Sequence, residues 1–444
     1  NDGPAARFEE GVDDAAPPTT TRAWFGRWQD VPLVSISQVL HLAGPALVTA
    51  PGTTVAVEPG WVANYRDGVL FLDDLEPSLP VITGAPHPVH SAVFAARLRA
   101  VAEQMGEQLL RLARSVSIRE RHDFSCGVFD ASGRLVVNAP HVPVHLGAMG
   151  ETVRALLARH GPALAPGQAW LCNDPYDGGS HLPDITMMTP VYADPQTRIG
   201  FVACRGHHVD VGGTTPGSMP PDARTIDDEG VVLGHHLFVS AGRSLPPDLG
   251  DCRQPEDVLA DLHAQAAACR LGAAGLSALA RELGEGVVAA QMGHLHAAAE
   301  SAVRGVLRGM NGVHRGQELL DDGTPIAVCL EVMGDGAVLT VDAPRHLGNR
   351  NAPRAVVRAA LLYVFRCLIA HDLPLNEGAL VPFLIRTTPG GLFEPVSPRA
   401  VCGGNVETSQ RLVDALLVAL GVCAASQGTM NNLTVGTPVG AWYE

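Results

Sequence analysis

The feature that most constrains this chain is a pair of short segments, residues 173–184 and 205–213, that combine turn-forming residues with metal-binding side chains. Their sequences are NDPYDGGSHLPD and RGHHVDVGG. Glycine and proline favour turns over helix here and let the backbone approach a small ligand closely. Imidazole and carboxylate groups together suit a divalent cation such as zinc or manganese better than thiolate chemistry does. The two segments therefore predict a metal site carried by loops and strand ends.

The candidate ligands in these segments are two histidines and an aspartate. His181 and Asp184 are three residues apart with a proline between them, which disfavours a helix but allows both side chains to meet on a loop. His207 or His208 would close the site from the end of the next strand. Because successive side chains of a strand point to opposite faces, only one of these two can contact the same ion.

A further carboxylate is available at the start of an earlier strand, from Asp123 in the segment ERHDFSC. A catalytic zinc site needs about three or four protein ligands and one position open to water or substrate. The alternative is a hydrogen-bonded loop cluster without a metal, in which His208 or Asp210 supports the loop. Spacing alone leaves both interpretations open.

Other segments offer groups for catalysis or substrate binding. His141 and His145 are expected on a proline-interrupted strand, either as substrate-facing proton-transfer groups or as buried structural residues. Glycine loops at residues 403–410 and 426–432 are rich in small amide and hydroxyl side chains, a pattern typical of sites for polar small molecules. Glu407, in the first loop, can cap a helix or act chemically. No nucleotide-binding glycine motif occurs, so this chain alone is not expected to bind ATP or NAD.

Composition limits the partners and the compartment. The net charge of −15 argues against a nucleic-acid or anionic-membrane partner. The 9 cysteines include no CxxC pair, which favours a reduced, cytoplasmic compartment over a secreted disulfide scaffold. The longest uncharged apolar run, residues 415–425, is too short to span a bilayer. The N-terminus has neither a basic nor an apolar region, so a signal peptide is not expected.

The pattern of elements predicts an α+β protein with a small β unit ahead of a large mixed domain. The expected boundaries are a disordered segment at 1–21, the β unit at 22–74, a proline-rich linker at 75–88 and the large domain at 89–444. Within the large domain we expect a long amphipathic helix up to about residue 115, a hairpin between 124 and 137, and a helix over 148–159. Residues 256–310 are expected to be helical, with interruptions near Gly272, Gly275 and 284–286.

Several blocks, taken together, resemble the hydantoinase B/oxoprolinase family, in the family's order across residues 90–444. The matching blocks lie at residues 120–126, 141–147, 173–184, 205–213, 216–219, 407–410 and 426–432. Residues 22–74 resemble the very end of the partner A component of that family. Relative to the family, the large domain is expected to be truncated at its C-terminus.

The resemblance implies a division of labour between two components. In the family, the A component binds ATP and phosphorylates the carbonyl oxygen of a cyclic amide such as 5-oxoproline or a hydantoin. The B component supplies a metal-containing site in which the activated ring is hydrolysed. ATP would therefore act only through an A-type subunit or domain, which is supplied elsewhere or missing, and an oligomer is expected.

Carried onto this sequence, the resemblance implies that the metal ligands are Asp123, His181, Asp184 and His207. The metal would be zinc or manganese, and it would polarise the activated carbonyl or acidify a bound water. His145 and Glu407 are the candidates for substrate-side or proton-transfer roles. Two alternatives stay open at this point: a component of an ATP-dependent ketone carboxylase, and a non-catalytic fragment of the family.

Overall fold

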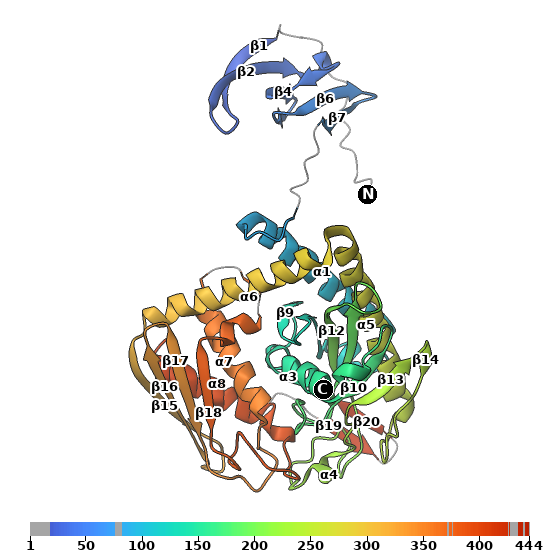
Figure 1. Ribbon diagram of the computed structural model, residues 1–444, viewed down its shortest axis with the longest axis vertical. Coiled ribbons are helices and arrows are strands. Elements are labelled where there is room, and N and C mark those ends of the chain that lie inside the picture. Colours follow the sequence, from blue (N-terminus) through green and yellow to red (C-terminus); the bar gives the residue numbers. More distant parts are fainter. Residues whose placement is uncertain are drawn as a thin grey trace. The chain divides into compact units, whose positions relative to one another are not determined.

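The computed structural model describes residues 18–75, 82–370, 373–374, 376–424, 426, 434–437 and 440–443 (Figure 1). The chain divides into two compact units, residues 1–81 and residues 82–444, each of which has its own core. Most of the segment predicted to be disordered, and residues 76–81 of the predicted linker, lie outside the described residues.

The first unit is built of short strands. Its two sheets have the strand orders β1-β2-β4-β5 and β3-β6-β7. The strands are β1 (Thr19–Trp24), β2 (Trp28–Ser35), β3 (Leu42–Ala43), β4 (Ala46–Ala50), β5 (Thr53–Val57), β6 (Trp61–Arg66) and β7 (Val69–Asp74). Asp67 and Gly68 both have positive φ values, 54° and 76°, as a two-residue hairpin turn between β6 and β7 requires.

The centre of the second unit is a seven-stranded sheet in which every described pairing is antiparallel. Its order is β14-β13-β10-β11-β12-β8-β9. The strands are β8 (Phe124–Asp130), β9 (Leu135–Asn138), β10 (Ala169–Cys172), β11 (Asp184–Tyr192), β12 (Arg198–His207), β13 (His236–Ser240) and β14 (Arg243–Ser244). Both faces are apolar, since Val202 and Cys204 belong to one buried cluster while Phe201 and Ala203 belong to another. A sheet with two buried faces needs helices on each side.

Helices α1 (Pro88–Leu112) and α5 (Pro255–Leu283) cover one face of this sheet. The predicted interruptions of α5 at Gly272 and Gly275 are wrong. A Cβ atom on Gly272 would lie 2.2 Å from the sulfur of Met105, so this glycine lets α1 and α5 pack closely instead of ending a helix. The break occurs at Gly284, whose φ is 89°, before α6 (Glu285–Arg308).

Helix α3 (Pro143–His160) covers the other face of the sheet and contacts α7 (Arg354–Leu368). Beyond them lies a second sheet with the order β15-β16-β17-β18, against which α8 (Glu407–Leu420) packs. Its strands are β15 (Gly312–Leu319), β16 (Pro325–Met333), β17 (Gly336–Asp342) and β18 (Phe383–Thr387). The shorter elements among the described residues include α2 (Val116–Arg119), α4 (Ile226–Glu229), β19 (Thr434–Thr437) and β20 (Gly440–Tyr443), together with four 3-10 helices: η1 (Ile36–Gln38), η2 (Gly161–Ala163), η3 (Glu377–Leu380) and η4 (Cys402–Gly404).

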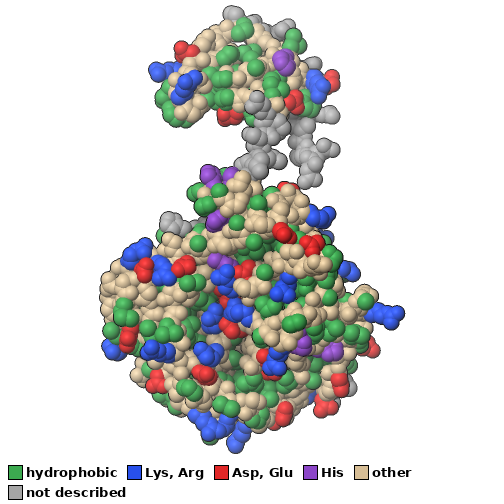
Figure 2. All heavy atoms as spheres, in the orientation of Figure 1, with side chains coloured by type: hydrophobic (Ala, Val, Ile, Leu, Met, Phe, Trp, Pro, Cys, Tyr) green, Lys and Arg blue, Asp and Glu red, His purple; other side chains and the backbone are tan. Residues whose placement is uncertain are grey.

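Mostly antiparallel, open sheets packed against helices confirm the α+β prediction. On the face of the molecule in Figure 2, basic and acidic side chains are interspersed over the larger unit and form no basic stripe. No helix among the described residues combines the length and the apolar character that crossing a membrane requires.

Candidate metal centre

The register of two neighbouring strands brings an aspartate and a histidine together. Asp184, the first residue of β11, lies directly opposite His207, the last residue of β12. Directly opposed residues of an antiparallel pair project from the same face, and the Asp184 Oδ1 atom is 3.2 Å from His207 Nδ1. The next residue, His208, points to the other side, where its Nε2 atom is 3.0 Å from Gln265 Oε1. The geometry thus places His207 in the cluster and His208 in the core.

The loop before β11 delivers the second histidine. Asn173 organises this loop, because its side chain accepts a hydrogen bond from the Leu233 N–H (2.6 Å) and donates one to the Leu182 carbonyl (2.9 Å). Gly178 has a φ of 92°, and a Cβ atom there would lie 2.7 Å from the backbone of Thr152, so only glycine fits. The result is a tight turn that points the ring of His181 towards Asp184 and His207.

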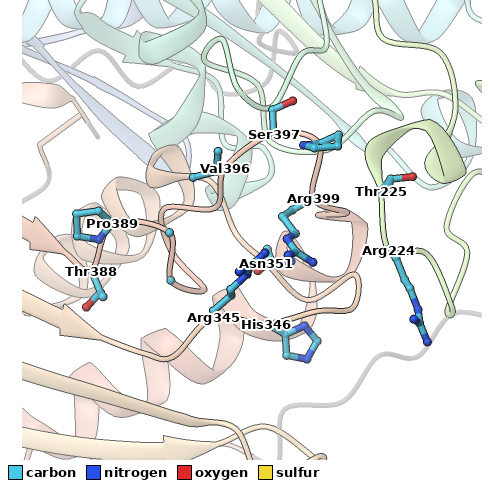
Figure 3. Close-up of a pocket in the computed structure, with 13 residues that line it drawn as sticks. Arg224, Thr225, Arg345, His346, Asn351, Thr388, Pro389, Val396, Ser397 and Arg399 are labelled. Carbon is cyan, nitrogen blue, oxygen red and sulfur yellow. The ribbon is translucent and has the colours of Figure 1, made fainter.

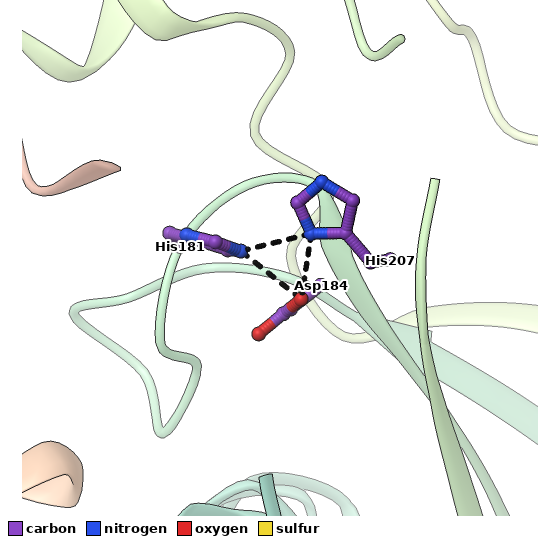
Figure 4. A group of neighbouring side chains, drawn as sticks. All are labelled: His181, Asp184 and His207. Carbon is purple, nitrogen blue, oxygen red and sulfur yellow. Dashed lines mark hydrogen bonds and ion pairs between the residues drawn. The ribbon is translucent and has the colours of Figure 1, made fainter. Parts of the chain in front are cut away.

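Three ligand atoms meet at this point, as Figure 4 shows. His181 Nε2 is 3.0 Å from Asp184 Oδ1 and 3.3 Å from His207 Nδ1. Two ligand atoms on one tetrahedral zinc ion, bound at 2.0–2.1 Å, are separated by about 3.3 Å. The donor set and its spacing therefore fit a single divalent cation. Within the described part of the chain, no other group of three His, Cys, Asp or Glu ligand atoms is gathered in this way.

The histidine rings are oriented by their second nitrogen or by a neighbouring charge. His181 Nδ1 is 3.3 Å from the carbonyl oxygen of Cys402, which places the proton on Nδ1 and leaves Nε2 as the ligand atom. Burial alone would lower the pKa of His207, but the hydrogen bond to Asp184 and the charges of Asp123 and Asp184 raise it overall. The contact of His181 Nδ1 with a carbonyl therefore suits a metal ligand, whereas the contact of His207 with Asp184 uses Nδ1, the ligand atom itself.

Asp184 is fully buried, and its surroundings keep it ionised. Burial would raise its pKa, but the charges and hydrogen bonds of His145 and His181 hold that pKa well below its ordinary value. The hydroxyl of Ser180 also donates to Asp184 Oδ2 (2.8 Å), and Asn405 Nδ2 approaches the same oxygen at 3.3 Å.

A buried arginine supports this carboxylate from behind. Arg205 is fully buried, and its guanidinium donates to the hydroxyls of Thr186 (2.8 Å), Thr152 (2.9 Å) and Ser180 (3.3 Å). Its positive charge therefore acts on Asp184 through the hydroxyl of Ser180 and leaves the carboxylate oxygens accessible to a cation. The sequence did not single out Ser180, Arg205 or Asn405. Ser180 is only four residues from Asp184. The role of Arg205 depends on residues 19, 25 and 53 positions away, which spacing does not reveal.

His145 and Asp123 lie on the same side of the cluster. His145 Nε2 is 3.3 Å from Asp184 Oδ2 and 3.8 Å from Asp123 Oδ1, and its Nδ1 atom is 3.3 Å from the hydroxyl of Ser125. Asp123 is not one of the three clustered ligand residues, although it lines the same cavity. The expectation that His145 lies on a strand is wrong. Helix α3 begins at Pro143, before the predicted residue 148, because proline at the first helical position sacrifices no hydrogen bond.

The cluster opens into a cavity of about 500 Å³. Asp123, His145, His181, Asp184 and His207 line one side, and the start of α8 contributes polar side chains to the other. Asn405, just before α8, has a buried Oδ1 atom that finds no hydrogen-bond partner among the described residues. An unsatisfied acceptor in a cavity is suited to a donor on a ligand, because burying it without a partner costs free energy.

Two other candidates lie away from the cluster. Glu407 is the first residue of α8 and forms an ion pair with Arg350 (2.8 Å), and it is not among the residues that line the cavity. His141 accepts a hydrogen bond from the Cys126 N–H (3.1 Å), and burial lowers its pKa to about 4. These contacts favour the structural interpretation of His141. Most of the predicted glycine loop at 426–432 lies outside the described residues.

Comparisons with known proteins agree with the resemblance found in the sequence. The chain is 38% identical to 5-oxoprolinase 1 of Arabidopsis thaliana over 94% of its own length, and 34% identical to 5-oxoprolinase of Saccharomyces cerevisiae over the same share. It spans about a third of the length of these relatives, 36% and 35% respectively. It is also 27% identical to caprolactamase subunit beta of Pseudomonas jessenii, covering 77% of this chain and 61% of the relative.

Two solved structures share the fold. The crystal structure of the ATP-dependent caprolactamase from Pseudomonas jessenii superposes with a TM-score of 0.69 at 25% identity, covering 76% of this chain and 60% of that one. A nucleotide-free acetone carboxylase superposes with a TM-score of 0.66 at 17% identity, covering 75% and 48%, and shows likeness of fold alone. The hydantoinase B/oxoprolinase family model matches residues 87–443. The chain therefore belongs to the hydantoinase B/oxoprolinase family.

Proposed function

We propose that this chain is the metal-containing hydrolytic part of an ATP-dependent cyclic-amide hydrolase that opens a ring such as 5-oxoproline or a hydantoin. The observation that carries the proposal is the meeting of His181 Nε2, Asp184 Oδ1 and His207 Nδ1 at the base of a cavity. Relatives named 5-oxoprolinase and caprolactamase support the cyclic-amide class. The ATP-binding part would be an A-type subunit or domain, because this sequence contains no nucleotide-binding motif.

A zinc or manganese ion bound by His181, Asp184 and His207, with Asp123 as a fourth ligand, would polarise a carbonyl oxygen and acidify a water molecule. Asp123 suits this role because it lines the same cavity and its charge acts on His207. Other residues of the chain would supply proton transfer and substrate orientation. An unstrained amide is a poor electrophile with a poor leaving group, so the substrate would arrive already activated by the ATP-binding component.

His145 is the group we assign to proton transfer. Its Nε2 atom faces Asp184 and Asp123 at the wall of the cavity, and the contact of Nδ1 with Ser125 fixes the plane of the ring. As water adds to the phosphorylated ring carbon, His145 Nε2 would accept a proton from the water and pass it to the ring nitrogen; the second proton of the water would follow the same route as the ring C–N bond breaks. The acyl phosphate left behind would then be hydrolysed by a second water to carboxylate and phosphate. General acid–base catalysis of this kind contributes about 10²–10⁴-fold to a rate.

Asn405 and α8 would orient the substrate. The unpaired Oδ1 atom of Asn405 is placed to accept a hydrogen bond from the ring N–H that forms once water has added, while its Nδ2 atom stays on Asp184. Glu407 would act indirectly, because its ion pair with Arg350 anchors the start of the helix that carries Ser409 and Gln410 to the cavity. We therefore assign Glu407 a positioning role.

The test combines the chain with the A-type component of its own system, ATP and 5-oxoproline, and measures glutamate formation. We expect turnover that requires both components, ATP and the metal, and that falls about 100-fold in His145→Asn. Bicarbonate-dependent carboxylation of a ketone would replace this proposal with the carboxylase alternative. Metal-loaded protein that is inactive with its partner on both substrate classes would favour a non-catalytic member.

A further inference from the structure

A second cavity, of about 760 Å³, lies in the larger unit and shares no lining residue with the cavity at the metal centre. Its walls come from the loop after β17, the loop after β18 and the residues just before α4 (Figure 3). Three arginines line it, one from each of these segments: Arg345, Arg399 and Arg224. No aspartate or glutamate is among the lining residues.

Arg224 and Arg345 are exposed and Arg399 is half-buried, so all three guanidinium groups can be reached by a ligand from solvent. Among the residues that the structure describes, no ion pair or hydrogen bond is formed by the guanidinium atoms of Arg345 or Arg399. The guanidinium of Arg224 forms none either, but its backbone N–H donates to Asp228 (3.0 Å) and its charge acts on that carboxylate. In the view of Figure 3, the side chains of Arg345 and Arg399 lie near Asn351 at the centre, whereas Arg224 lies at the edge with its guanidinium directed away from that pair. Each guanidinium carries five N–H donors in a fixed plane. The cavity therefore offers many donors and a concentrated positive charge.

The neutral and imidazole groups of the wall are mostly engaged already. The hydroxyls of Thr225 and Thr388 donate to Asp228 (3.0 Å) and Asp342 (2.7 Å). Both ring nitrogens of His346 have partners, Asp322 Oδ2 (2.8 Å) and the Gly348 N–H (3.1 Å). The nearby carboxylates of Asp228, Asp342 and Asp322 thus bind Thr225, Thr388 and His346 of the cavity wall. The donors left for a ligand are therefore those of the arginines, together with the hydroxyl of Ser397.

The arrangement selects a type of anion. A carboxylate offers two oxygens in one plane, whereas a phosphate group offers three oxygens in different directions, which suits the guanidinium groups of Arg345 and Arg399 that arrive from two separate segments. The volume is within the range of about 300–1,000 Å³ that organic ligands occupy, so a bare phosphate ion would leave much of it unfilled. Apolar side chains, Pro389, Val396 and Pro398, line the rest. We propose that this cavity binds a small organic molecule through its phosphate group.

The test uses three probes that separate these features: phenyl phosphate, benzoate and inorganic phosphate, each titrated by calorimetry. Phenyl phosphate should bind one-to-one, and benzoate, which has the same ring but a planar anion, at least about 10-fold more weakly. Inorganic phosphate should also bind more weakly than phenyl phosphate, because it leaves the apolar wall uncovered. Arg345→Gln and Arg399→Gln should each weaken phenyl phosphate at least about 10-fold.

Two controls make the result specific. Arg243, on β14, is another exposed arginine, and Arg243→Gln should leave the affinity unchanged. Asp184→Asn should also leave the affinity for phenyl phosphate unchanged, because Asp184 does not line this cavity. If the phosphate were bound at the metal centre instead, its binding would be lost together with the metal. Absence of binding, equal binding of benzoate, or equal losses in Arg243→Gln and Arg399→Gln would overturn the proposal. Loss of binding in Asp184→Asn alone would assign the phosphate to the metal centre and overturn it as well.

Discussion

Two buried carboxylates of the larger unit, Asp184 and Glu377, show how similar burial leads to different chemistry. Glu377 receives the Leu135 N–H (2.8 Å) and the guanidinium groups of Arg154 (2.9 Å to each oxygen) and Arg358 (2.9 Å). Asp184 is approached instead by the imidazoles of His145, His181 and His207. A guanidinium can only donate, whereas a neutral imidazole presents a lone pair as well. The imidazole nitrogens around Asp184 can therefore bind a cation, whereas the guanidinium nitrogens around Glu377 cannot.

The position of the nearest arginine makes the same distinction. Arg154 and Arg358 contact Glu377 directly, while Arg205 stands behind Asp184 and reaches it through the hydroxyl of Ser180. Burial raises the pKa of both carboxyls, but nearby groups lower each pKa below its ordinary value. For Glu377 these groups are Arg154 and Arg358, and for Asp184 they are His145 and His181. Ionisation alone therefore does not mark a metal site. The type of donor around the carboxylate does.

The largest expected effect is on metal binding in Asp184→Asn. The substitution keeps the size of the side chain but removes the anionic ligand, so metal affinity should fall more than about 100-fold, beyond the effect of losing a supporting residue. Elemental analysis and metal titration of the purified proteins measure this. Wild-type stoichiometry in Asp184→Asn would show that the cluster holds no cation.

Glu377→Gln should produce the converse result. Removing one partner of a buried ion pair costs about 3 kcal/mol of unfolding free energy, here because Arg154 and Arg358 lose their shared carboxylate. The folded variant should still bind one metal ion, since none of the cluster residues contacts Glu377. Urea denaturation and metal analysis test the two halves. Loss of metal without loss of stability would break the comparison.

The stabilising effect of Glu377 should depend on pH. Its folded-state pKa is lowered, so its contribution is present above the ordinary value of 4.5 and is lost as the pH falls through the folded-state pKa. The difference in unfolding free energy between wild type and Glu377→Gln should therefore shrink as the pH is lowered from 7 towards 3. Denaturation curves across this range provide the measurement, and a difference that stays constant with pH would contradict it.

A third buried carboxylate, Glu229, should show the opposite sign. Its Oε1 atom accepts the N–H groups of Val401 (2.6 Å) and Cys402 (2.8 Å), but burial without a cationic partner raises its pKa to about 7. A raised pKa means that stability is greatest below 4.5 and is lost as the pH rises through about 7. Glu229→Gln should therefore gain on the order of 1 kcal/mol over wild type between pH 5 and pH 8. A loss over that interval would exclude a protonated Glu229.

The smallest effect is expected for Glu407→Gln. Its ion pair with Arg350 is partly exposed, with 34% of the Glu407 side chain accessible, and such pairs contribute about 1 kcal/mol or less. Partner-dependent turnover should change less than about threefold, against the far larger loss in His145→Asn. Comparable losses in the two variants would move Glu407 from a positioning role to a catalytic one.

The sequence predicted those parts of the site that depend on local rules. Turn residues around His181 and Asp184, and the alternation of His207 and His208 along a strand, are local features. The structure brings His181, Asp184 and His207 together, and their role as metal ligands stays a prediction. The role of Arg205 could not be predicted from local sequence, because it depends on hydroxyls from three separate segments.

The same limit explains the errors in the fold. A glycine such as Gly272 often marks the end of a helix, but here it allows close packing against Met105 in a helix far away in the sequence. The sequence around Pro143 predicts an interrupted strand, but proline equally begins a helix. The packing of α3 on the sheet decides between the two. Glu407 shares a motif with the cavity-lining Ser409 and Gln410, yet at the first turn of α8 it faces Arg350.

The most direct test is anomalous diffraction from crystals of the purified protein loaded with zinc or manganese. One anomalous peak should lie within bonding distance, about 2.0–2.2 Å, of His181 Nε2, an Asp184 carboxylate oxygen and His207 Nδ1. Crystals of metal-loaded protein without a peak there, or with the ion bound by other side chains, would contradict the account.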